Sequence, residues 1–216
     1  MSSPGLGPVI LVTAAKQMGS RLHWQDEVIA SEIPLGASVL DLGCGDGQLL
    51  SQLIRTRGAR GQGIELDPDA VVKCIERLVP VLQADLDAGL AGFPDGSFDY
   101  VVLEETIQTL QHPIRVLDEM LRVGRFGIVS FPNFGHRNVI RDLSERGRMP
   151  VTDWLPHRWH NSPNIHLCTL QDFVDWTEES RVQILKGFVL TDGLVRPLQP
   201  GDNRQSEQVL LFLART

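Results

Sequence analysis

Residues 39–47 read Val39-Leu40-Asp41-Leu42-Gly43-Cys44-Gly45-Asp46-Gly47, and a helical pattern follows them. The apolar run predicts a buried strand. Glycines after the strand let the backbone turn sharply and approach a ligand, and the first turn of the next helix directs its free amides at any anionic group. This stretch therefore predicts a nucleotide-like ligand at the end of a strand.

The spacing of the glycines separates two kinds of ligand. A dinucleotide fingerprint has its third glycine three positions after the second, whereas Gly47 lies two positions after Gly45, and Asp41 precedes the first glycine. This spacing disfavours NAD. A second interpretation stays open, in which the glycines only form a tight structural turn.

Outward from this stretch, short apolar runs alternate with helical patterns. This alternation is typical of βαβ units that build a parallel sheet. Asp67-Pro68 predicts a helix start, because an N-cap acid precedes a proline at the first helical position, and Thr169 to Asp172 resembles a capping box. We expect strands at residues 39–42, 61–66, 79–82, 98–103, 126–131, 182–190 and 208–214, and helices at residues 21–33, 47–56, 67–77, 113–123 and 169–178.

Two more acids follow the next strands. Glu65 ends the second expected strand, where a carboxylate can accept hydrogen bonds from both hydroxyls of a ribose. Asp85 follows the third, where it would meet the exocyclic amine of an adenine. Because the carboxyl ends of parallel strands share one edge of the sheet, Asp41, Glu65 and Asp85 are expected to converge on one crevice. Each acid alone reads equally well as a solvated loop residue.

Composition narrows the class of protein. The chain has 216 residues, of which 42% are hydrophobic and 22% charged, as in globular domains that bury a core. Its net charge of −7 has the wrong sign for a protein that neutralises nucleic-acid phosphates. The longest apolar runs are too short to cross a membrane and no cationic export leader is present. We therefore expect a cytoplasmic protein with neither a nucleic-acid nor a membrane partner.

Cysteine usage points to reduced thiols. Cys44, Cys74 and Cys168 are an odd number with no paired spacing and no histidine at ligand spacing. We expect neither a disulfide framework nor a metal site.

The expected organisation is a single domain over residues 21–216, preceded by a leader or edge segment at residues 1–20 that is assigned no function. Residues 132–168 interrupt the βαβ rhythm with no clear period and are longer than ordinary loops, which predicts a lid-like insertion.

Polar and aromatic residues in this insertion have two interpretations each. Asn133 and His136 at its start, with Asn164 and His166 at its end, either lock it onto the sheet or recognise a second substrate. Trp154 and Trp159 belong either to a core or to a surface that binds a partner, since large amphipathic residues are enriched in both.

Residues 38–131 resemble the class I methyltransferases that bind S-adenosylmethionine. The resemblance is carried by the motif from Asp41 to Gly47, by Glu65, by Asp85 and by the approach from Phe93 to Tyr100. It implies an α/β, Rossmann-like class I methyltransferase fold: a seven-stranded, mostly parallel sheet in the order 3-2-1-4-5-7-6, with an antiparallel last strand and helices on both faces. It also implies S-adenosylmethionine or S-adenosylhomocysteine as the cofactor, bound by Asp41, Gly43, Cys44, Gly45, Gly47, Glu65, Leu66, Asp85, Leu86 and Glu104.

A narrower resemblance, from about residue 22 to residue 172, is to MetW, a family of bacterial methionine-biosynthesis proteins. Its most specific marks are the runs from Phe131 to His136 and from Pro163 to Thr169. The resemblance implies a partner, homoserine O-acyltransferase, which this chain would support or sense. It brings no methyl acceptor. Two alternatives stay open: an active small-molecule methyltransferase with an unknown acceptor, or a protein that keeps the fold without the cofactor.

Methyl transfer to oxygen or nitrogen needs a base within reach of the acceptor. The candidates by position are Glu104, Glu105, His112, His136 and His166. Each histidine reads more readily as a packed or capping residue, so we assign no catalytic residue.

Overall fold

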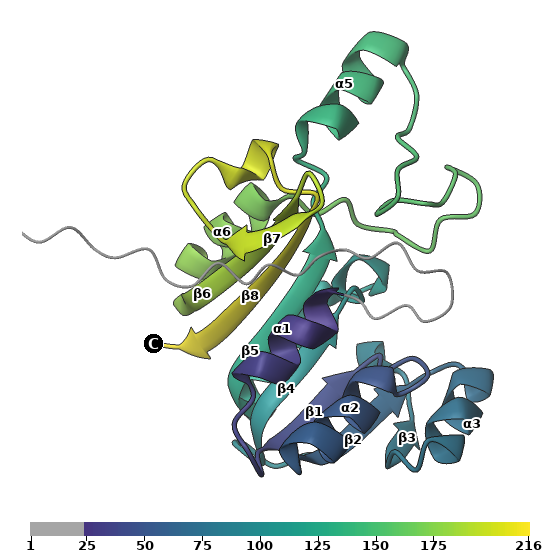
Figure 1. The fold of residues 1–216 in the computed structure, drawn as a ribbon, viewed down its shortest axis with the longest axis vertical. Helices are drawn as coiled ribbons and strands as arrows, with labels where there is room; N and C mark the ends of the chain where they lie inside the picture. The colour runs from purple at the N-terminus through teal and green to yellow at the C-terminus, as the bar shows by residue number, and fades with distance from the viewer. Residues whose placement is uncertain (1–23) are drawn as a thin grey trace, which may run out of the picture.

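The structure is a computed structural model that describes residues 24–216. The segment at residues 1–20, and the first residues of the helix expected at 21–33, lie outside the described residues. One eight-stranded sheet runs through the molecule in the order β3-β2-β1-β4-β5-β8-β6-β7 (Figure 1). Its strands are β1 (Ser38–Leu42), β2 (Arg60–Glu65), β3 (Val81–Gln83), β4 (Phe98–Glu104), β5 (Gly124–Pro132), β6 (Val182–Thr191), β7 (Leu194–Pro197) and β8 (Gln208–Arg215).

The predicted strand order is confirmed, because β8 inserts antiparallel between β5 and β6 while β1 to β5 run parallel. The eighth strand, β7, was not predicted: it pairs antiparallel with β6 at the edge of the sheet. A two-residue loop joins the pair, and both of its residues, Asp192 and Gly193, have positive φ angles (48° and 76°). This Asp-Gly pair is a common hairpin signal, so the sequence did contain the evidence for β7.

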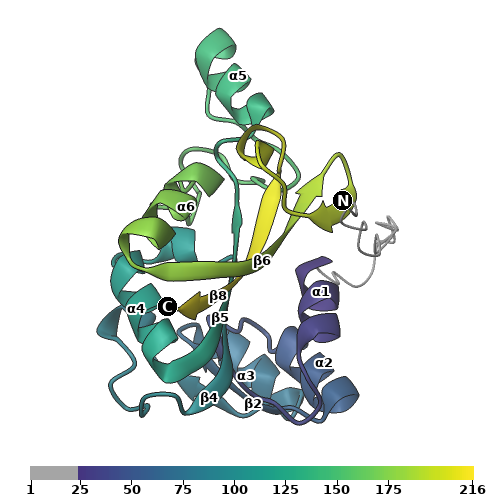
Figure 2. The same ribbon diagram turned by 90° about the vertical axis from the view of Figure 1, so that its left-hand side faces the viewer.

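Helices cover both faces of the sheet (Figure 2). On one face lie α1 (Trp24–Glu32), α2 (Gln48–Arg57) and α3 (Pro68–Glu76), and their buried residues form a core with β1, β5 and β8. On the other face lie α4 (Pro113–Val123) and α6 (Leu170–Glu179). None of the helices among residues 24–216 is long and apolar enough to cross a bilayer.

Local capping explains where two helices begin. Asp67 accepts a hydrogen bond from the backbone N–H of Asp69 at 2.9 Å, and Pro68 occupies the first helical position of α3. Thr169 and Asp172 form the predicted capping box at the start of α6. Each cap satisfies backbone donors that a helix start would otherwise leave free, so both predicted boundaries are confirmed.

The insertion at residues 132–168, whose sequence shows no clear period, contains one helix, α5 (Arg137–Arg146), that we did not predict. This helix extends away from the sheet beyond α6 (Figures 1 and 2). Only Val139 of its residues is buried, so the apolar pattern that reveals core-facing helices is almost missing. His136 caps its start and Gly147, with φ 59°, ends it.

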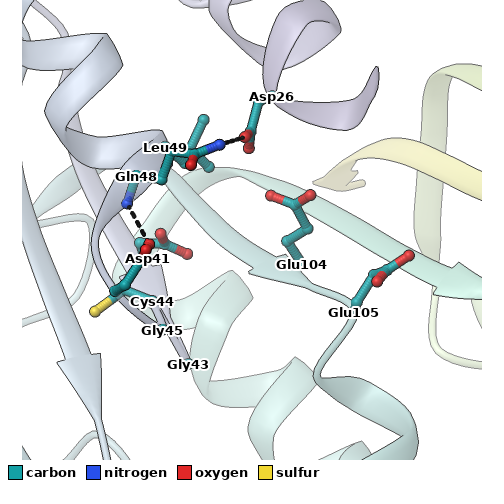
Figure 3. Close-up of a pocket in the computed structure, with 10 residues that line it drawn as sticks. Asp26, Asp41, Gly43, Cys44, Gly45, Gln48, Leu49, Glu104 and Glu105 are labelled. Carbon is teal, nitrogen blue, oxygen red and sulfur yellow. Dashed lines mark hydrogen bonds between the residues drawn. The ribbon is translucent and has the colours of Figure 1, made fainter. Parts of the chain in front are cut away.

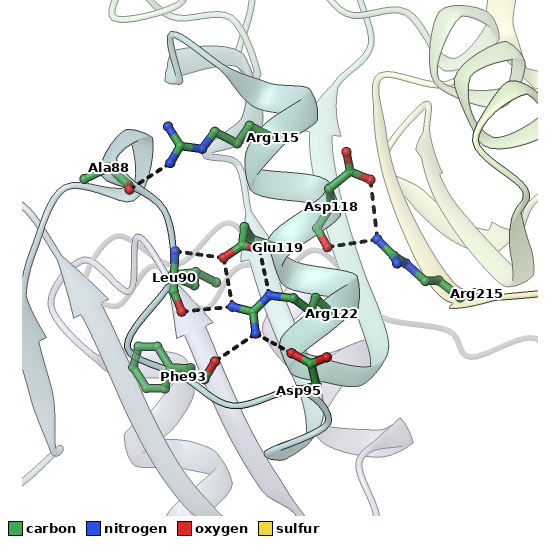
Figure 4. A network of polar contacts seen from close by, with 9 residues as sticks. All are labelled: Ala88, Leu90, Phe93, Asp95, Arg115, Asp118, Glu119, Arg122 and Arg215. Atoms are coloured by element: carbon green, nitrogen blue, oxygen red, sulfur yellow. Dashed lines mark hydrogen bonds and ion pairs between the residues drawn. The ribbon is translucent and has the colours of Figure 1, made fainter.

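Arg122 of α4 fixes the segment that joins β3 to β4 (Figure 4). Its guanidinium donates to the backbone oxygens of Leu90 (3.1 Å) and Phe93 (2.9 Å) and to the carboxylates of Asp95 (2.6 Å) and Glu119 (2.7 Å). Because the same segment starts with the residues that follow β3, this network holds one wall of the site described next.

Candidate functional site

The turn from β1 into α2 depends on glycine. Gly43, Gly45 and Gly47 have φ angles of 75°, 54° and 76°, a region that costs other residues energy. A Cβ on Gly43 would lie 2.7 Å from Oγ1 of Thr106, and one on Gly47 would lie 2.9 Å from Sγ of Cys74. The three glycines are therefore required by the turn itself, as well as by any ligand that approaches it.

Two cavities meet at this turn. The acidic cavity, of about 330 Å³, lies between β1, β4 and α1 and is shown in Figure 3. The strand-end cavity, of about 470 Å³, lies beyond β2 and β3. Gly43 lines both cavities. Thr106, whose side chain lies directly against Gly43, lines the strand-end cavity and donates from Oγ1 to the backbone oxygen of Glu104 at 2.8 Å.

The residues predicted from the sequence divide between these cavities. We expected Asp41, Glu65 and Asp85 to share one crevice, but Asp41 lines the acidic cavity and the other two line the strand-end cavity. Gly47 lines neither and serves as the N-cap of α2. The acidic cavity takes in Asp41, Gly43, Cys44, Gly45 and Glu104, and the strand-end cavity takes in Gly43, Glu65, Leu66, Asp85 and Leu86.

Glu65 fastens the glycine turn to the end of β2. Its Oε2 accepts from the backbone N–H of Gly45 at 2.8 Å, and its Oε1 accepts from Leu66 (2.8 Å) and Asp67 (2.9 Å). The carboxylate is half-buried, so its remaining lone pairs can accept from a ligand in the strand-end cavity. Asp85 is exposed and caps the short helix η1 (Leu86–Ala88).

Five described residues with carboxyl groups line the acidic cavity, and three of them come from three different helices and strands. Asp26 comes from α1, Asp41 from β1 and Glu104 from β4, and Figure 3 shows the side chains of Asp26 and Glu104 pointing toward one another. Asp26 also accepts from Nε2 of Gln48 at 3.1 Å. Burial and the neighbouring negative charges both favour the protonated forms of these carboxyl groups.

Both central acids have strongly raised pKa values. Burial, followed by the charges of Asp26 and Glu65, raises the pKa of Asp41 to about 8. Burial also raises the pKa of Glu104 well above its usual value, with further contributions from Asp26, Asp41 and Glu105. The cavity therefore retains protons near neutral pH that a cationic group inside it would displace.

Glu105, by contrast, accepts hydrogen bonds from two side-chain amides. Gln25 of α1 donates to its Oε1 at 3.0 Å, and Gln208 of β8 donates to the same atom. Trp24 in turn donates to Gln208 at 2.9 Å. This network ties α1 to the end of β4 and so holds Asp26 over the cavity.

Sequence reasoning missed Asp26, Gln25 and Gln208. These residues lie near the two ends of the described chain, and only the fold brings them to the end of β4. The one available signal was the pair of acids in the first turn of α1, which is also a common solvated helix start.

None of the candidate histidines lines the acidic cavity. His136 is buried and caps α5 by accepting from the backbone N–H of Asn138 at 3.3 Å. His112 lies 3.5 Å from Asp87, before α4. His166 is exposed, and its backbone donates to Gln108 at 3.0 Å. Of the candidate bases, Glu104 and Glu105 are the ones that the fold brings to the cavity.

Asn133 anchors the insertion. It is fully buried, donates to the backbone oxygens of Asn203 (2.8 Å) and Ser206 (2.9 Å), and accepts from Gly135 (2.9 Å) and Leu170 (3.0 Å). The far end of the insertion is held where the backbone of Ile165 donates to Gln108 at 2.9 Å. These contacts favour the locking interpretation over substrate recognition for Asn133.

The two tryptophans of the insertion differ. Trp154 packs edge-on against His136, with ring centroids 5.2 Å apart. Trp159 is 80% exposed and lines a groove of about 280 Å³ together with Met149 and Leu167. We call this cavity the insertion groove.

The two cavities, which share Gly43 in their linings, suit an elongated ligand with different ends. The strand-end cavity offers a carboxylate to a diol, and the acidic cavity offers buried carboxyls to a cation. Among residues 24–216, no group of three or more His, Cys, Asp or Glu side chains is arranged to hold a metal ion.

Comparison with known proteins gives a family match. Residues 24–212 match the family model described as "Methionine biosynthesis protein MetW". The "Bifunctional methionine biosynthesis protein MetXA/MetW" of Rhodopirellula baltica is 39% identical over 172 residues, which is 76% of this chain and 28% of that protein. The chain spans between about a quarter and about half the length of the first curated relatives that it matches.

Solved structures share the fold at low sequence identity. A TehB-like SAM-dependent methyltransferase from Corynebacterium glutamicum matches with a TM-score of 0.62 and 18% identity, over 92% of this chain and 90% of its own. A SAM-dependent methyltransferase from Thermotoga maritima, a possible histamine N-methyltransferase, matches with a TM-score of 0.65 and 16% identity, over 89% and 87%. The predicted class I methyltransferase fold is therefore confirmed.

Proposed function

The chain belongs to the MetW family of methionine-biosynthesis proteins, and from this premise we propose that it binds S-adenosylmethionine or S-adenosylhomocysteine and acts with homoserine O-acyltransferase as a supporting or sensing partner. The cofactor part and the partner part rest on different observations and have separate tests.

The junction of two cavities at Gly43 carries the cofactor part. The adenosine would occupy the strand-end cavity, with its ribose hydroxyls on Glu65 and its base near Asp85, and the methionine end would pass Gly43 into the acidic cavity. The residues present fit the cofactor: Asp41 is 3% exposed and lines the acidic cavity, and its side-chain carboxyl group accepts no hydrogen bond from residues 24–216, which leaves it free to accept from a cationic ligand. When bound, S-adenosylmethionine supplies a methyl group on a positively charged sulfur.

Glu65→Ala is expected to weaken cofactor binding about ten- to a hundredfold. The change removes charge-assisted hydrogen bonds to the ribose, worth about 1.5–3 kcal/mol. It also frees the backbone N–H of Gly45 that Glu65 holds. Isothermal titration calorimetry with S-adenosylmethionine measures the change.

Glu76→Ala is the matched control, since this glutamate is exposed at the end of α3 and lines neither cavity. It should bind the cofactor as the wild type does. An unchanged affinity in Glu65→Ala, or no heat from the wild type at millimolar cofactor, would contradict the cofactor proposal.

The partner part is supported by a relative and by a surface. The name of the Rhodopirellula baltica relative joins MetXA and MetW in one bifunctional protein. In this chain, the insertion presents large apolar side chains to solvent: Met149, Val151, Trp159, Ile165 and Leu167 are 41–80% exposed. Aromatic anchors inside a groove are typical binding hot spots, so we place the acyltransferase on the insertion groove.

Trp159→Ala is expected to weaken the complex with homoserine O-acyltransferase by about 2 kcal/mol, or roughly thirtyfold. Trp154→Ala should act mainly on the stability of the insertion, because Trp154 packs on His136. Leu35→Ala is the control, since Leu35 is 76% exposed and precedes β1, far from the insertion in sequence. Biolayer interferometry with the acyltransferase of the same organism measures the affinities.

Addition of the wild-type chain should also raise acyltransferase activity. If S-adenosylmethionine changes the affinity of the two proteins, the partner must change the affinity for the cofactor by the same factor. Absence of both a complex and activation, with and without cofactor, would contradict the partner proposal and leave the cofactor proposal standing.

Glu104 favours a second candidate function, an active small-molecule methyltransferase. Its position in the acidic cavity places a carboxyl group where a base could take a proton from an acceptor. A radiolabelled methyl-transfer assay with cell extract separates the two: a labelled product would favour the enzyme, and binding without transfer would favour the sensing partner.

A further inference from the structure

The acidic cavity contains more carboxyl groups than the anchoring of one amino group requires. Asp26, Asp41 and Glu104 converge on a single cavity, and Glu65 is near enough to Asp41 to raise its pKa. Described residues that line the cavity include no lysine, arginine or histidine. A cation inside the cavity would relieve this repulsion, and two positive charges would relieve more of it than one.

Asp41 independently points to a ligand. Its side chain is almost completely buried, it lines the cavity, and no residue in the described part of the chain donates a hydrogen bond to it. Buried carboxyl groups of native proteins nearly always have hydrogen-bond partners. The fold therefore leaves this position to a donor that is not part of residues 24–216.

The covalent structure of the cofactor places its charges along this path. Its sulfur is bonded to the 5′ carbon of the ribose and to the methionine chain, so a ribose on Glu65 and an amino acid beside Asp41 put the sulfur near Gly43. Glu104 and Gly43 line the same acidic cavity, so the carboxyl group of Glu104 shares that cavity with the expected position of the sulfur. S-adenosylmethionine has both an ammonium and a sulfonium, whereas S-adenosylhomocysteine has only the ammonium.

We propose that the acidic cavity recognises the sulfonium charge through Glu104, so that this chain binds S-adenosylmethionine more tightly than S-adenosylhomocysteine. The inference rests on the proposed cofactor site and adds its specificity. A protein with this preference responds to the ratio of the methylated to the demethylated cofactor, and not only to their sum.

The test compares three ligands by calorimetry at pH 7.5 and low salt: S-adenosylmethionine, S-adenosylhomocysteine and sinefungin, in which a protonated amine replaces the methylated sulfonium. Wild-type protein should bind S-adenosylmethionine about tenfold or more tightly than S-adenosylhomocysteine, with sinefungin close to S-adenosylmethionine. Glu104→Gln keeps the shape of the side chain and removes the charge. This variant should bind S-adenosylmethionine and sinefungin, the two ligands with two positively charged groups, more weakly than the wild type does. The preference over S-adenosylhomocysteine should then fall to within about twofold.

Glu76→Gln is the matched control, because it makes the same change from a carboxylate to an amide at an exposed position that ends α3 and lines neither cavity. This variant should keep the wild-type preference. Thermal denaturation of each variant without ligand checks that it is folded.

The outcomes separate the inference from its premise. Equal or tighter binding of S-adenosylhomocysteine by the wild type would overturn the inference alone, as would a Glu104→Gln variant that weakens all three ligands by one common factor. Absence of binding by any of the three ligands would overturn the proposed function together with the inference. If sinefungin binds as weakly as S-adenosylhomocysteine, the protein recognises the methyl group and not the positive charge, which would also overturn the inference.

Discussion

Gly43→Ala is expected to destabilise the protein by about 2–4 kcal/mol and to remove measurable cofactor binding. The new Cβ would lie 2.7 Å from Oγ1 and 2.9 Å from Cγ2 of Thr106, closer than such atoms approach. The φ angle of 75° adds a further cost that glycine does not have. Because Gly43 lines both cavities, a backbone shift that relieves the clash also changes the shape of both. Urea denaturation and calorimetry measure the two effects.

Thr106→Ala provides the internal control for this clash. It removes both atoms nearest to the added Cβ and leaves the Thr106 Cβ at 3.4 Å, an ordinary contact. The double variant should therefore regain about half of the lost stability and keep only the cost of the positive φ angle. Strictly additive effects of the two changes would show that the close approach of Thr106 to Gly43 is not the cause.

Asp41→Asn is expected to flatten the pH dependence of stability of the ligand-free protein. Burial raises the pKa of Asp41 from 3.8 to about 8, so the folded state holds a proton that the unfolded chain has released. The contribution of Asp41 to the free energy of unfolding is therefore fully present below about pH 4 and is lost as the pH rises toward 8. Between pH 6 and 8 the wild type should lose about 2 kcal/mol more than the variant.

Other groups titrate in the same window but are shared by both proteins. Burial lowers the pKa of His136, which makes stability rise with pH near 6, and Glu104 acts in the same direction as Asp41. The difference between wild type and variant therefore reports Asp41 together with the part of the Glu104 shift that the charge of Asp41 causes. Urea denaturation curves at pH 6 and pH 8 measure it, and parallel losses in the two proteins would contradict the buried, proton-holding state of Asp41.

Regular elements with a buried face could be predicted from the sequence. The apolar run of β1 is buried on both faces of the sheet, and α4 begins and ends at the predicted residues because it buries Val116, Leu117 and Met120 on one face. α5 was missed because a helix that buries only Val139 lacks that pattern. The edge strand β7 was missed because the Asp192-Gly193 signal was not weighed as a hairpin turn.

Site residues that belong to one local motif could be predicted from the sequence. Site residues that come together from distant segments could not. Asp41 and the glycines follow one another along the chain, and Glu65 and Asp85 each end a strand or follow one. Asp26 reaches Glu104 only because α1 packs over the ends of β1 and β4, a contact that no local pattern reveals. For the same reason, the division into two cavities that meet at Gly43 became visible only in the structure.

A crystal structure of the chain with S-adenosylmethionine tests most directly the proposal that one ligand spans both cavities. We expect the ribose hydroxyls within hydrogen-bond distance of the Glu65 carboxylate, the sulfur beside Gly43 and the amino group in contact with Asp41. Electron density for the cofactor elsewhere on the protein, or with its methionine end directed away from the acidic cavity, would contradict this account.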